Sequence, residues 1–495
     1  MSLRRPGLWA AGAGALAALG HAPFSLAPVS LVGFAGLIWL VAVQTRSPWG
    51  AARIAWVAGT IYFAVSLHWI VEPFLVDVAR HGWMAPFALV LMAGGLALFW
   101  GGAGYLAGYL GAARLSRGMA FAAALALAEL ARGYVLSGFP WALPGYIWID
   151  SILSLFAADV GPYGLTAVTL LFTALPVVWR RWWIGAVPLA AIGALSMVEA
   201  PPSAGSSSLG TVRLVQPNAP QDEKWDPEKA HVFVERQIGF TEAPKDGVDL
   251  IVWPETALPY RLDRATPVLQ RMAGGADGVP VIFGINRSED ARNFNALVSI
   301  DATGAPTEIY DKVRLVPFGE FIPFGKLAEL VGLRSFAAQD GYGFSPGAEV
   351  RAIDTPLGQA LPLICYEAIF PQHIRALDAR PDYLLQITND AWFGVFSGPF
   401  QHLDQARFRA IEQGLPLVRV ANTGVSAVID ARGHVIAQLE LNEPGYLDVV
   451  VPQGHAATLY SRVGDSPVLV LLSFLLAALA RHRWRNAIAM RREAG

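Results

Sequence analysis

The sequence predicts a multi-pass α-helical membrane domain with eight spans and an α/β domain inserted between the seventh and eighth spans. Of the 495 residues, 54% are hydrophobic and only 15% are charged, and the mean hydropathy is +0.42. Because a soluble globular protein has about 25% charged residues, a large part of this chain is expected to lie in lipid. The apolar blocks are confined to residues 7–198 and to a stretch near the end. The segment between them alternates between strand-like and helical patterns.

Eight apolar blocks are candidate membrane spans. They cover residues 8–22, 27–44, 54–72, 84–110, 118–134, 152–178, 183–198 and 466–480. Several approach the roughly 20 residues that a helix needs to cross the hydrocarbon core. The first block is not expected to be a cleaved signal peptide, because it continues into a second apolar block without a convincing cleavage site.

The arginines near these blocks predict the orientation of the chain. They cluster before the first block, at every second break and after the last block. The residues are Arg4, Arg5, Arg46, Arg53, Arg114, Arg117, Arg180, Arg181, Arg481, Arg483, Arg485, Arg491 and Arg492. The intervening loops hold few cations, of which Arg80 is the main one. By the positive-inside rule, both termini are expected in the cytoplasm and the inserted domain on the opposite side of the membrane.

Two charged residues, Glu129 and Arg132, fall within or at the end of the fifth block. Charged side chains inside a span usually face the interior of a helix bundle or a cavity. Because the two residues are three apart on a helix, a local ion pair and a functional role are both compatible with the pattern.

Composition divides the chain into five segments. Residues 1–198 are the predicted transmembrane domain, and residues 199–210, rich in proline, glycine and serine, are a flexible linker. Residues 211–465 are the α/β domain, residues 466–480 the eighth span and residues 481–495 a basic tail. Strands are expected at 211–216, 249–253, 279–285, 296–300, 360–364, 383–388, 417–420, 426–429 and 446–451, and helices at 227–241 and 402–413. Strands that alternate with helices are typical of a layered α/β fold.

Charge and cysteine content narrow the class of function. The formal net charge of −2 gives no support for nucleic-acid binding. Cys365 is the only cysteine, so the chain forms no internal disulfide. It follows a five-residue apolar run that is typical of a strand buried on both faces. A lone cysteine is more often a small buried hydrophobic residue, so it needs partners elsewhere in the sequence before it indicates a nucleophile.

Two further strand-end residues have the chemistry that such a nucleophile requires. Glu255 follows a strand-like run that ends in Trp253-Pro254, and Lys312 lies in a segment that becomes rich in proline, glycine and aromatic residues. A carboxylate can take the proton of a thiol, and a cation can stabilise an oxyanion. Taken singly, Glu255 is also compatible with a helix-start carboxylate and Lys312 with a surface lysine.

Three short motifs, in this order along the chain, resemble the Glu–Lys–Cys triad of the nitrilase (carbon–nitrogen hydrolase) superfamily. They are Trp253-Pro254-Glu255, Asp311-Lys312-Val313-Arg314-Leu315 and Ile364-Cys365-Tyr366-Glu367. Two more segments, residues 388–394 and 419–426, strengthen the match. With seven spans before this domain and one after it, the whole chain resembles the bacterial apolipoprotein N-acyltransferases.

The resemblance implies a fold, a reaction and a location. The inserted domain would be a nitrilase-like αββα sandwich in the periplasm, and the chain a protein of the bacterial inner membrane. A phospholipid, typically phosphatidylethanolamine, would donate an acyl chain to Cys365. The α-amino group of the diacylglyceryl-cysteine of an apolipoprotein would then accept it, in the last step of lipoprotein maturation. No metal or other cofactor is implied.

The resemblance also assigns supporting roles. Glu320, Tyr366 and Glu367 would support the active site. Residues that would bind substrate are Trp225, Asn389, Trp392 and Phe393. The aromatic, glycine- and proline-rich loops at residues 316–324 and 392–400 are compatible with packing on the domain itself. They also fit a mobile lid that dips into the outer leaflet of the membrane.

Two alternatives share parts of this pattern. A membrane-tethered nitrilase-type amidase has the same triad but lets water resolve the acyl-enzyme, and eight spans are more than a tether needs. A transporter or receptor with a catalytically inactive binding domain explains the spans but not the intact triad.

Overall fold

The computed structural model describes residues 5–45, 47–179, 182–203, 207–290, 292–323, 343–377 and 379–493. Four arginines of the predicted loop pattern, Arg4, Arg46, Arg180 and Arg181, and the last residue of one aromatic loop, Phe324, lie outside these residues. The chain forms two compact units. The helical unit contains Met1–Pro201, Phe396–Asp404 and Thr458–Gly495, and the α/β unit contains Pro202–Val395 and Gln405–Ala457.

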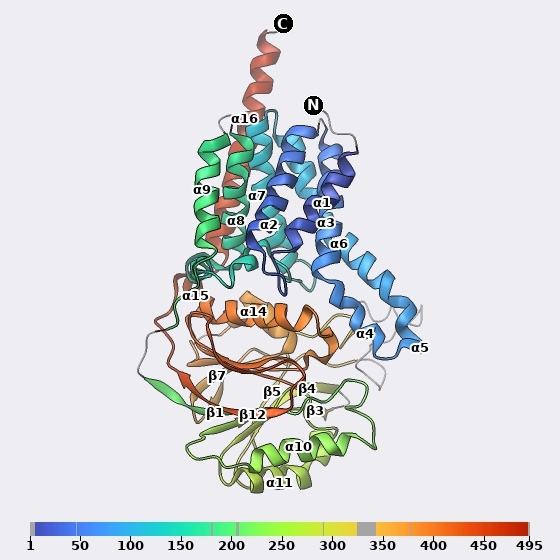
Figure 1. The fold of residues 1–495 in the computed structure, drawn as a ribbon, viewed down its shortest axis with the longest axis vertical. Helices are drawn as coiled ribbons and strands as arrows, with labels where there is room; N and C mark the ends of the chain where they lie inside the picture. Colours follow the sequence, from blue (N-terminus) through green and yellow to red (C-terminus); the bar gives the residue numbers. More distant parts are fainter. Residues whose placement is uncertain are drawn as a thin grey trace. The chain divides into compact units, whose positions relative to one another are not determined.

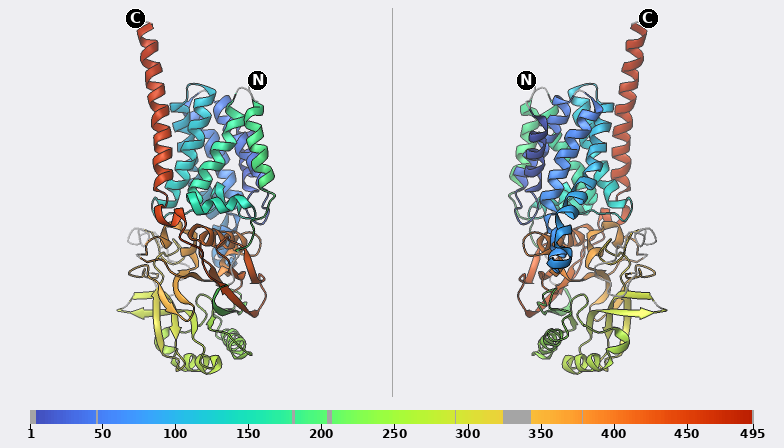
Figure 2. Two further views of the ribbon diagram at one scale, coloured as in Figure 1. Left: turned by 90° about the vertical axis from the view of Figure 1, so that its left-hand side faces the viewer. Right: turned by 90° about the vertical axis from the view of Figure 1, so that its right-hand side faces the viewer.

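A long helix lies on each of the eight apolar blocks of the helical unit. These helices are α1 (Pro6–Ala18), α2 (Ala27–Trp39, continued by a π-helical turn, Leu40–Gln44), α3 (Pro48–Ser66), α6 (Ala85–Leu110), α7 (Arg114–Tyr134), α8 (Ala157–Val178), α9 (Trp182–Leu195) and α16 (Ser466–Glu493). Short helices α4 (Glu72–Leu75), α5 (Val78–His81) and α15 (Leu459–Val463) connect or flank them. Figure 2 shows the C-terminal part of α16 projecting beyond the other helices of this unit.

Among the described residues, four segments are long and apolar enough to cross a membrane. They are Ala27–Gln44, Val78–Leu110, Ile152–Val178 and Ser466–Ala489. A fifth is obtained if Pro48–Ser66 and His68–Leu75, bent by 65°, form one span. The chain is therefore a membrane protein with several candidate spans.

Small residues allow close helix packing in this unit. A Cβ atom on Gly14 of α1 would lie 2.1 Å from the backbone oxygen of Ala58 in α3. A Cβ atom on Gly104 of α6 would lie 2.6 Å from the backbone oxygen of Ala51 in α3. Glycine at these positions lets the backbones approach, which is how helices associate where lipid removes the hydrophobic driving force.

The charged pair in α7 is satisfied within the helical unit. Arg132 forms an ion pair with Glu129, and both side chains are buried. Glu129 also accepts a hydrogen bond from Trp100 Nε1 at 2.6 Å, and Arg132 donates to the carbonyl of Phe139. These contacts favour the structural interpretation of the pair over a functional one.

The α/β unit is built on two six-stranded sheets (Figures 1 and 2). The first has the order β12-β1-β2-β3-β4-β5 and the second β11-β10-β9-β8-β7-β6. The strands are β1 (Ser208–Gln216), β2 (Leu250–Val252), β3 (Val281–Glu289), β4 (Arg292–Ile300), β5 (Pro306–Asp311), β6 (Ile353–Thr355), β7 (Gly358–Ile364), β8 (Tyr383–Thr388), β9 (Leu417–Ala421), β10 (Ser426–Ile429), β11 (Val435–Leu439) and β12 (Gly445–Pro452). Strands β7, β8 and β9 are parallel neighbours, as are β1, β2 and β3.

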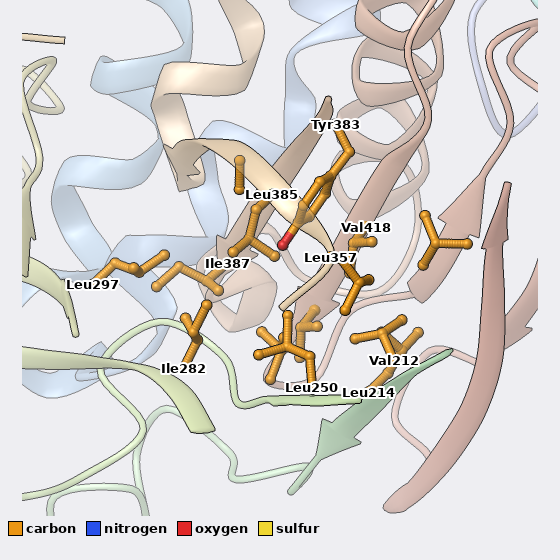
Figure 3. Close-up of a cluster of buried hydrophobic side chains, with 14 of the residues drawn as sticks. Val212, Leu214, Leu250, Ile282, Leu297, Leu357, Tyr383, Leu385, Ile387 and Val418 are labelled. Atoms are coloured by element: carbon orange, nitrogen blue, oxygen red, sulfur yellow. The ribbon is translucent and has the colours of Figure 1, made fainter. Parts of the chain in front are cut away.

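Two apolar clusters hold these layers together. The first contains side chains of both sheets, among them Val212, Leu250, Leu385 and Val418, and therefore lies between the sheets (Figure 3). The second joins the outer face of the first sheet to helices α10 (Ala230–Glu242) and α11 (Thr266–Ala276). Helix α14 (Gly398–Gln413), from Gln405 onward, lies on the side of the second sheet, where its residues are largely buried. Arg409 of this helix donates a hydrogen bond to the carbonyl of Ile369 at 2.9 Å. The unit is thus an α/β sandwich with helices outside two packed sheets.

All nine strands expected from the sequence are confirmed, with shifts of one to four residues at some ends. Three strands were not predicted. β6 has only three residues, and β5 and β11 expose many of their side chains, so none of the three has a continuous apolar run. Helix α11 was also not predicted.

Candidate active site

The three residues of the predicted triad each lie just beyond the end of a strand. Glu255 follows β2 after Trp253-Pro254, Lys312 directly follows β5, and Cys365 directly follows β7. Glu255 and Lys312 therefore come from the first sheet and Cys365 from the second. β2 and β7 are buried between two layers, and the polar residues begin where their apolar runs stop; β5, before Lys312, is an edge strand with one buried side chain.

The structure brings the Lys312 ammonium between two carboxylates. Lys312 Nζ lies 3.1 Å from Glu255 Oε1 and 2.9 Å from Glu320 Oε1, and all three side chains are buried. The amide of Asn295 donates to the same two carboxylate oxygens, at 2.7 Å to Glu255 and 3.1 Å to Glu320. Glu320 Oε2 accepts from the backbone N–H of Val316 at 2.8 Å. Glu320, expected as a supporting residue, is thus in direct contact with the triad lysine.

Electrostatics keep this lysine charged. Burial alone would lower the pKa of Lys312, but the carboxylates of Glu255 and Glu320 outweigh burial and raise the pKa well above its usual range. A fixed cation in a buried site is suited to stabilise an oxyanion, because it needs no reorganisation when the charge forms.

Cys365 sits at a strained turn, and its surroundings disfavour the thiolate form. Its φ angle is +51°, in the left-handed region, and it begins a short 3-10 helix (Cys365–Ile369). Burial and, after it, the charge of Glu255 raise the pKa of the Cys365 thiol, although the Lys312 ammonium acts in the opposite direction. A thiol in this state needs a base to become a nucleophile, and Glu255 is the triad carboxylate whose charge acts on it.

Glu367 ties the lysine segment to the cysteine segment. Its carboxylate accepts from the backbone N–H groups of Val313 at 2.7 Å, Arg314 at 3.1 Å and Ile364 at 2.8 Å. Burial raises the pKa of Glu367 to about 7, against the effect of these backbone donors. Because Val313 follows Lys312 and Ile364 precedes Cys365, Glu367 fixes two triad residues relative to each other. The neighbouring Tyr366 is also buried.

Asn389, expected to bind substrate, lies against the carboxylate of Glu255. Its backbone N–H donates to Glu255 Oε2 at 2.9 Å. Its side-chain amide donates to Gln221 Oε1 at 2.8 Å and accepts from Asn422 Nδ2 at 2.8 Å. Asn422 also exchanges two hydrogen bonds with the backbone of Ala219. Asn389 thereby connects the segment around residues 219–221 to the site.

Lys224, from this same segment, contacts the backbone of Glu255. Its buried Nζ donates to the carbonyl oxygen of Glu255 at 3.2 Å and to Thr256 Oγ1 at 2.9 Å. Burial lowers the pKa of Lys224 to about 8. The next residue, Trp225, is 37% exposed, and its ring lies 5.6 Å from Lys224 Nζ.

The two aromatic loops contain both buried and exposed side chains. Phe393 packs on the cluster between the sheets, and Trp392 is half-buried. By contrast, Phe318 is 56% exposed and Val395 is 61% exposed. Both loops therefore present apolar surface beyond what the domain itself covers.

Four residues of this site had no role predicted from the sequence: Asn295, Lys224, Gln221 and Asn422. The only signal for Asn295 is that it is a polar residue within β4, followed by five residues that are all buried. Lys224 and Gln221 precede a tryptophan that the resemblance singled out, and Asn422 lies inside one of the matching segments.

An α/β sandwich in which strand ends bring a glutamate, a lysine and a cysteine together defines the class of carbon–nitrogen hydrolases. The sequence model of the carbon-nitrogen hydrolase family matches residues 211–459. The model of the apolipoprotein N-acyltransferase N-terminal domain matches residues 13–175.

Related proteins extend this similarity to the whole chain. It is 40% identical to an apolipoprotein N-acyltransferase of Caulobacter vibrioides, over 95% of this chain and 93% of that protein. It is 36% identical to apolipoprotein N-acyltransferases of Rhodopseudomonas palustris and Bradyrhizobium diazoefficiens, over 94% and 95% of this chain and 92% and 94% of those proteins. The chain belongs to the apolipoprotein N-acyltransferase family. Among solved structures, an amidase from Nesterenkonia sp. is 20% identical, covering 54% of this chain and 97% of the amidase, with a TM-score of 0.37.

Proposed function

We propose that this protein transfers a fatty acyl chain from a phospholipid to the α-amino group of the N-terminal diacylglyceryl-cysteine of apolipoproteins. The acyl chain passes through a thioester on Cys365. The observation that carries this proposal is the Lys312 ammonium, which lies 3.1 Å from Glu255 and 2.9 Å from Glu320 and whose charge acts on the thiol of Cys365, the only cysteine of the chain. The full-length relatives named above support the choice of substrates.

In the first half-reaction Glu255 takes the proton of the Cys365 thiol. The sulfur attacks the ester carbonyl of the phospholipid, and Lys312, with a backbone N–H near Cys365, stabilises the tetrahedral oxyanion. The C–O bond then breaks, and Glu255 returns the proton to the departing oxygen. The products are a lysophospholipid and an acylated Cys365.

In the second half-reaction the acceptor is the α-amino group of the diacylglyceryl-cysteine. Glu255 takes a proton from this amine as its nitrogen attacks the thioester, and Lys312 again stabilises the oxyanion. The C–S bond breaks, the sulfur regains a proton, and the product is an amide. Both substrates use one site in turn, so the kinetics are ping-pong. Phosphatidylethanolamine is the expected donor.

The membrane topology belongs to the same proposal. Residues 1–198 form seven spans, residues 199–210 a linker, residues 211–465 the periplasmic catalytic domain, residues 466–480 the eighth span and residues 481–495 a cytoplasmic tail. The uneven distribution of arginines supports cytoplasmic termini. The exposed apolar side chains of Phe318 and Val395 support a membrane-facing role for the two aromatic loops, with Trp225, Trp392 and Phe393 contacting substrate.

A membrane-tethered amidase remains the rival function. It would share the first half-reaction in form but use water in the second. The match of the N-terminal region to the acyltransferase-specific domain, and the alignment of acyltransferases along more than nine-tenths of the chain, favour the acyltransferase.

The test is transfer of a labelled acyl group. The purified full-length protein is incubated with a phospholipid carrying a clickable acyl chain and a diacylglyceryl-cysteine peptide. We expect the label first on Cys365 as a hydroxylamine-sensitive thioester and then on the peptide amine. Cys365→Ala, which leaves a small apolar side chain in a buried position, is expected to lose both signals while the protein still folds. Release of free fatty acid alone, or transfer by the alanine variant, would refute the proposal.

A further inference from the structure

Thr388 lies beside the nucleophile at the end of the neighbouring strand. In the parallel pair β7 and β8, Ile364 is in register with Ile387, so Cys365 and Thr388 are the next residues on the two strands. Both are buried, at 5% and 0% exposure. The Thr388 hydroxyl is hydrogen-bonded to the Cys365 thiol. None of the roles proposed above uses this hydroxyl.

The Thr388 hydroxyl also contacts a buried ion pair. Thr388 Oγ1 donates to Asp390 Oδ1 at 2.9 Å, and Asp390 is paired with Arg419. Arg419 also donates to the carbonyl of Val425 at 3.1 Å. A Cβ atom on Gly424 would lie 2.3 Å from Asp390 Oδ2, so only glycine there allows the carboxylate its position.

A hydroxyl group has one proton to donate and two lone pairs that accept. While Thr388 donates to Asp390, it can only accept from the thiol of Cys365. When the thiol loses its proton, the same hydroxyl can turn and donate to the sulfur. Asp390 keeps its ion pair with Arg419 during this change, so its carboxylate is not left without a partner.

The Cys365 thiolate needs such a donor because the Lys312 ammonium already pairs with two carboxylates. Lys312 Nζ lies 3.1 Å from Glu255 and 2.9 Å from Glu320, and the carboxylates of Glu255 and Asp390 both disfavour negative charge on the sulfur. A hydrogen bond to a charged group stabilises it more than a bond between neutral groups.

We propose that Thr388 is a further catalytic residue, whose hydroxyl donates a hydrogen bond to the Cys365 thiolate whenever that thiolate forms. Asp390, paired with Arg419, is a positioning residue that orients the hydroxyl while the thiol is protonated. This inference rests on the proposed acyl transfer. In the first half-reaction the donor stabilises sulfur after its proton has moved to Glu255. In the second, it stabilises the sulfur that takes the electron pair of the breaking C–S bond, before Glu255 returns the proton.

The experiment compares Thr388→Val with Thr388→Ser in the full-length protein in detergent. Valine keeps the shape of threonine and removes the hydroxyl, whereas serine keeps the hydroxyl. The rate of alkylation by iodoacetamide reports on the thiolate of Cys365 alone, because the chain has one cysteine. We expect Thr388→Val to slow alkylation about 10- to 100-fold, and Thr388→Ser to stay within about threefold of the parent protein.

A second variant separates the positioning role of Asp390 from the effect of its charge on the sulfur. Asp390→Asn keeps an oxygen that accepts from Thr388 but removes a negative charge near the sulfur. We expect faster alkylation, whereas a purely structural role for Asp390 predicts no increase. Alkylation of Thr388→Val at the parent rate, or equal losses in the valine and serine variants, would overturn the proposal.

Alkylation requires no lipid, so its outcome is independent of the acyl-transfer assay. A parent protein that transfers no acyl group, together with a slow Thr388→Val variant, would refute the proposed function and still support the role of Thr388. The reverse result would support acyl transfer and exclude the role of Thr388.

Discussion

Replacing Glu320 with glutamine removes one of the two negative charges that hold the Lys312 ammonium. Glutamine has nearly the same shape, but its amide group has only one accepting oxygen. That oxygen cannot accept from both Lys312 Nζ, now 2.9 Å from Oε1, and the N–H of Val316, now 2.8 Å from Oε2. One donor would therefore face the NH₂ group. The change tests whether Lys312 depends on both carboxylates.

The size of the effect follows from the geometry. At a separation of 2.9 Å and an effective dielectric constant of about 20, two unit charges attract by about 6 kcal/mol. Relief of the desolvation of the Glu320 carboxylate offsets part of this, and Glu255 still pairs with Lys312. We expect a net loss of about 3 kcal/mol in transition-state stabilisation, which corresponds to about 100-fold slower acylation of Cys365.

The assay is single-turnover acylation of Cys365 by a labelled phospholipid. The matched control is Glu308→Gln, which makes the same substitution in another ion pair. Glu308 lies 2.9 Å from Arg351, and the side chains are 26% exposed for Glu308 and 37% for Arg351. Such partly exposed pairs contribute about 1 kcal/mol or less, so the control should acylate at nearly the parent rate. Acylation of Glu320→Gln within threefold of the parent, or equal losses in both variants, would refute the argument.

Two further predictions concern residues that contact Glu255, the proposed base. The pKa of Lys224 is lowered to about 8 from a usual 10.5, so between these pH values the unfolded chain binds more protons and the free energy of unfolding rises with pH. Lys224→Met removes this rise. In denaturant titrations, the free energy of unfolding of the variant should therefore fall further below that of the parent, by about 3 kcal/mol from pH 8 to 10.5. Parallel pH profiles for the two proteins would contradict this prediction. Asn295→Ala removes the amide that donates to both carboxylates, at 2.7 and 3.1 Å, and should slow single-turnover acylation about tenfold. An unchanged acylation rate would contradict this role of Asn295.

Most strands that the sequence predicts in the α/β unit are buried on both faces, and their apolar runs are continuous and end abruptly; β12, an edge strand with two buried residues, is also predicted. The same property points to Glu255 and Cys365 near the ends of β2 and β7, whereas Lys312 follows the exposed strand β5 and is predicted only through its motif. The edge strands β5, β6 and β11 lack this signal, because one or both of their faces are exposed. Their existence depends on the neighbouring strand rather than on their own composition.

Helix bounds in the helical unit show a similar limit. Helix α3 begins at Pro48, six residues before the predicted block at residue 54, because proline fits the first turn and Ser47 Oγ accepts from the N–H of Gly50 at 3.0 Å. Helix α16 continues to Glu493, past the predicted span end at residue 480. Arginine and alanine favour helices as well as leucine does, so hydropathy locates the apolar part of the helix and not its end.

Two of the residues that the sequence did not predict, Asn295 and Lys224, contact Glu255 from distant segments, and the other two, Gln221 and Asn422, contact it through Asn389. The Glu255 carboxylate accepts from Asn295 Nδ2 at 2.7 Å, Lys312 Nζ at 3.1 Å and the N–H of Asn389 at 2.9 Å. Its backbone carbonyl accepts from Lys224 Nζ at 3.2 Å. These donors come from both sheets and from the segment before α10, and no spacing in the sequence relates them. The orientation of Glu255, the proposed base, therefore depends on packing of the two sheets against each other, and substitutions that loosen the core between the sheets should reduce acylation before they unfold the domain.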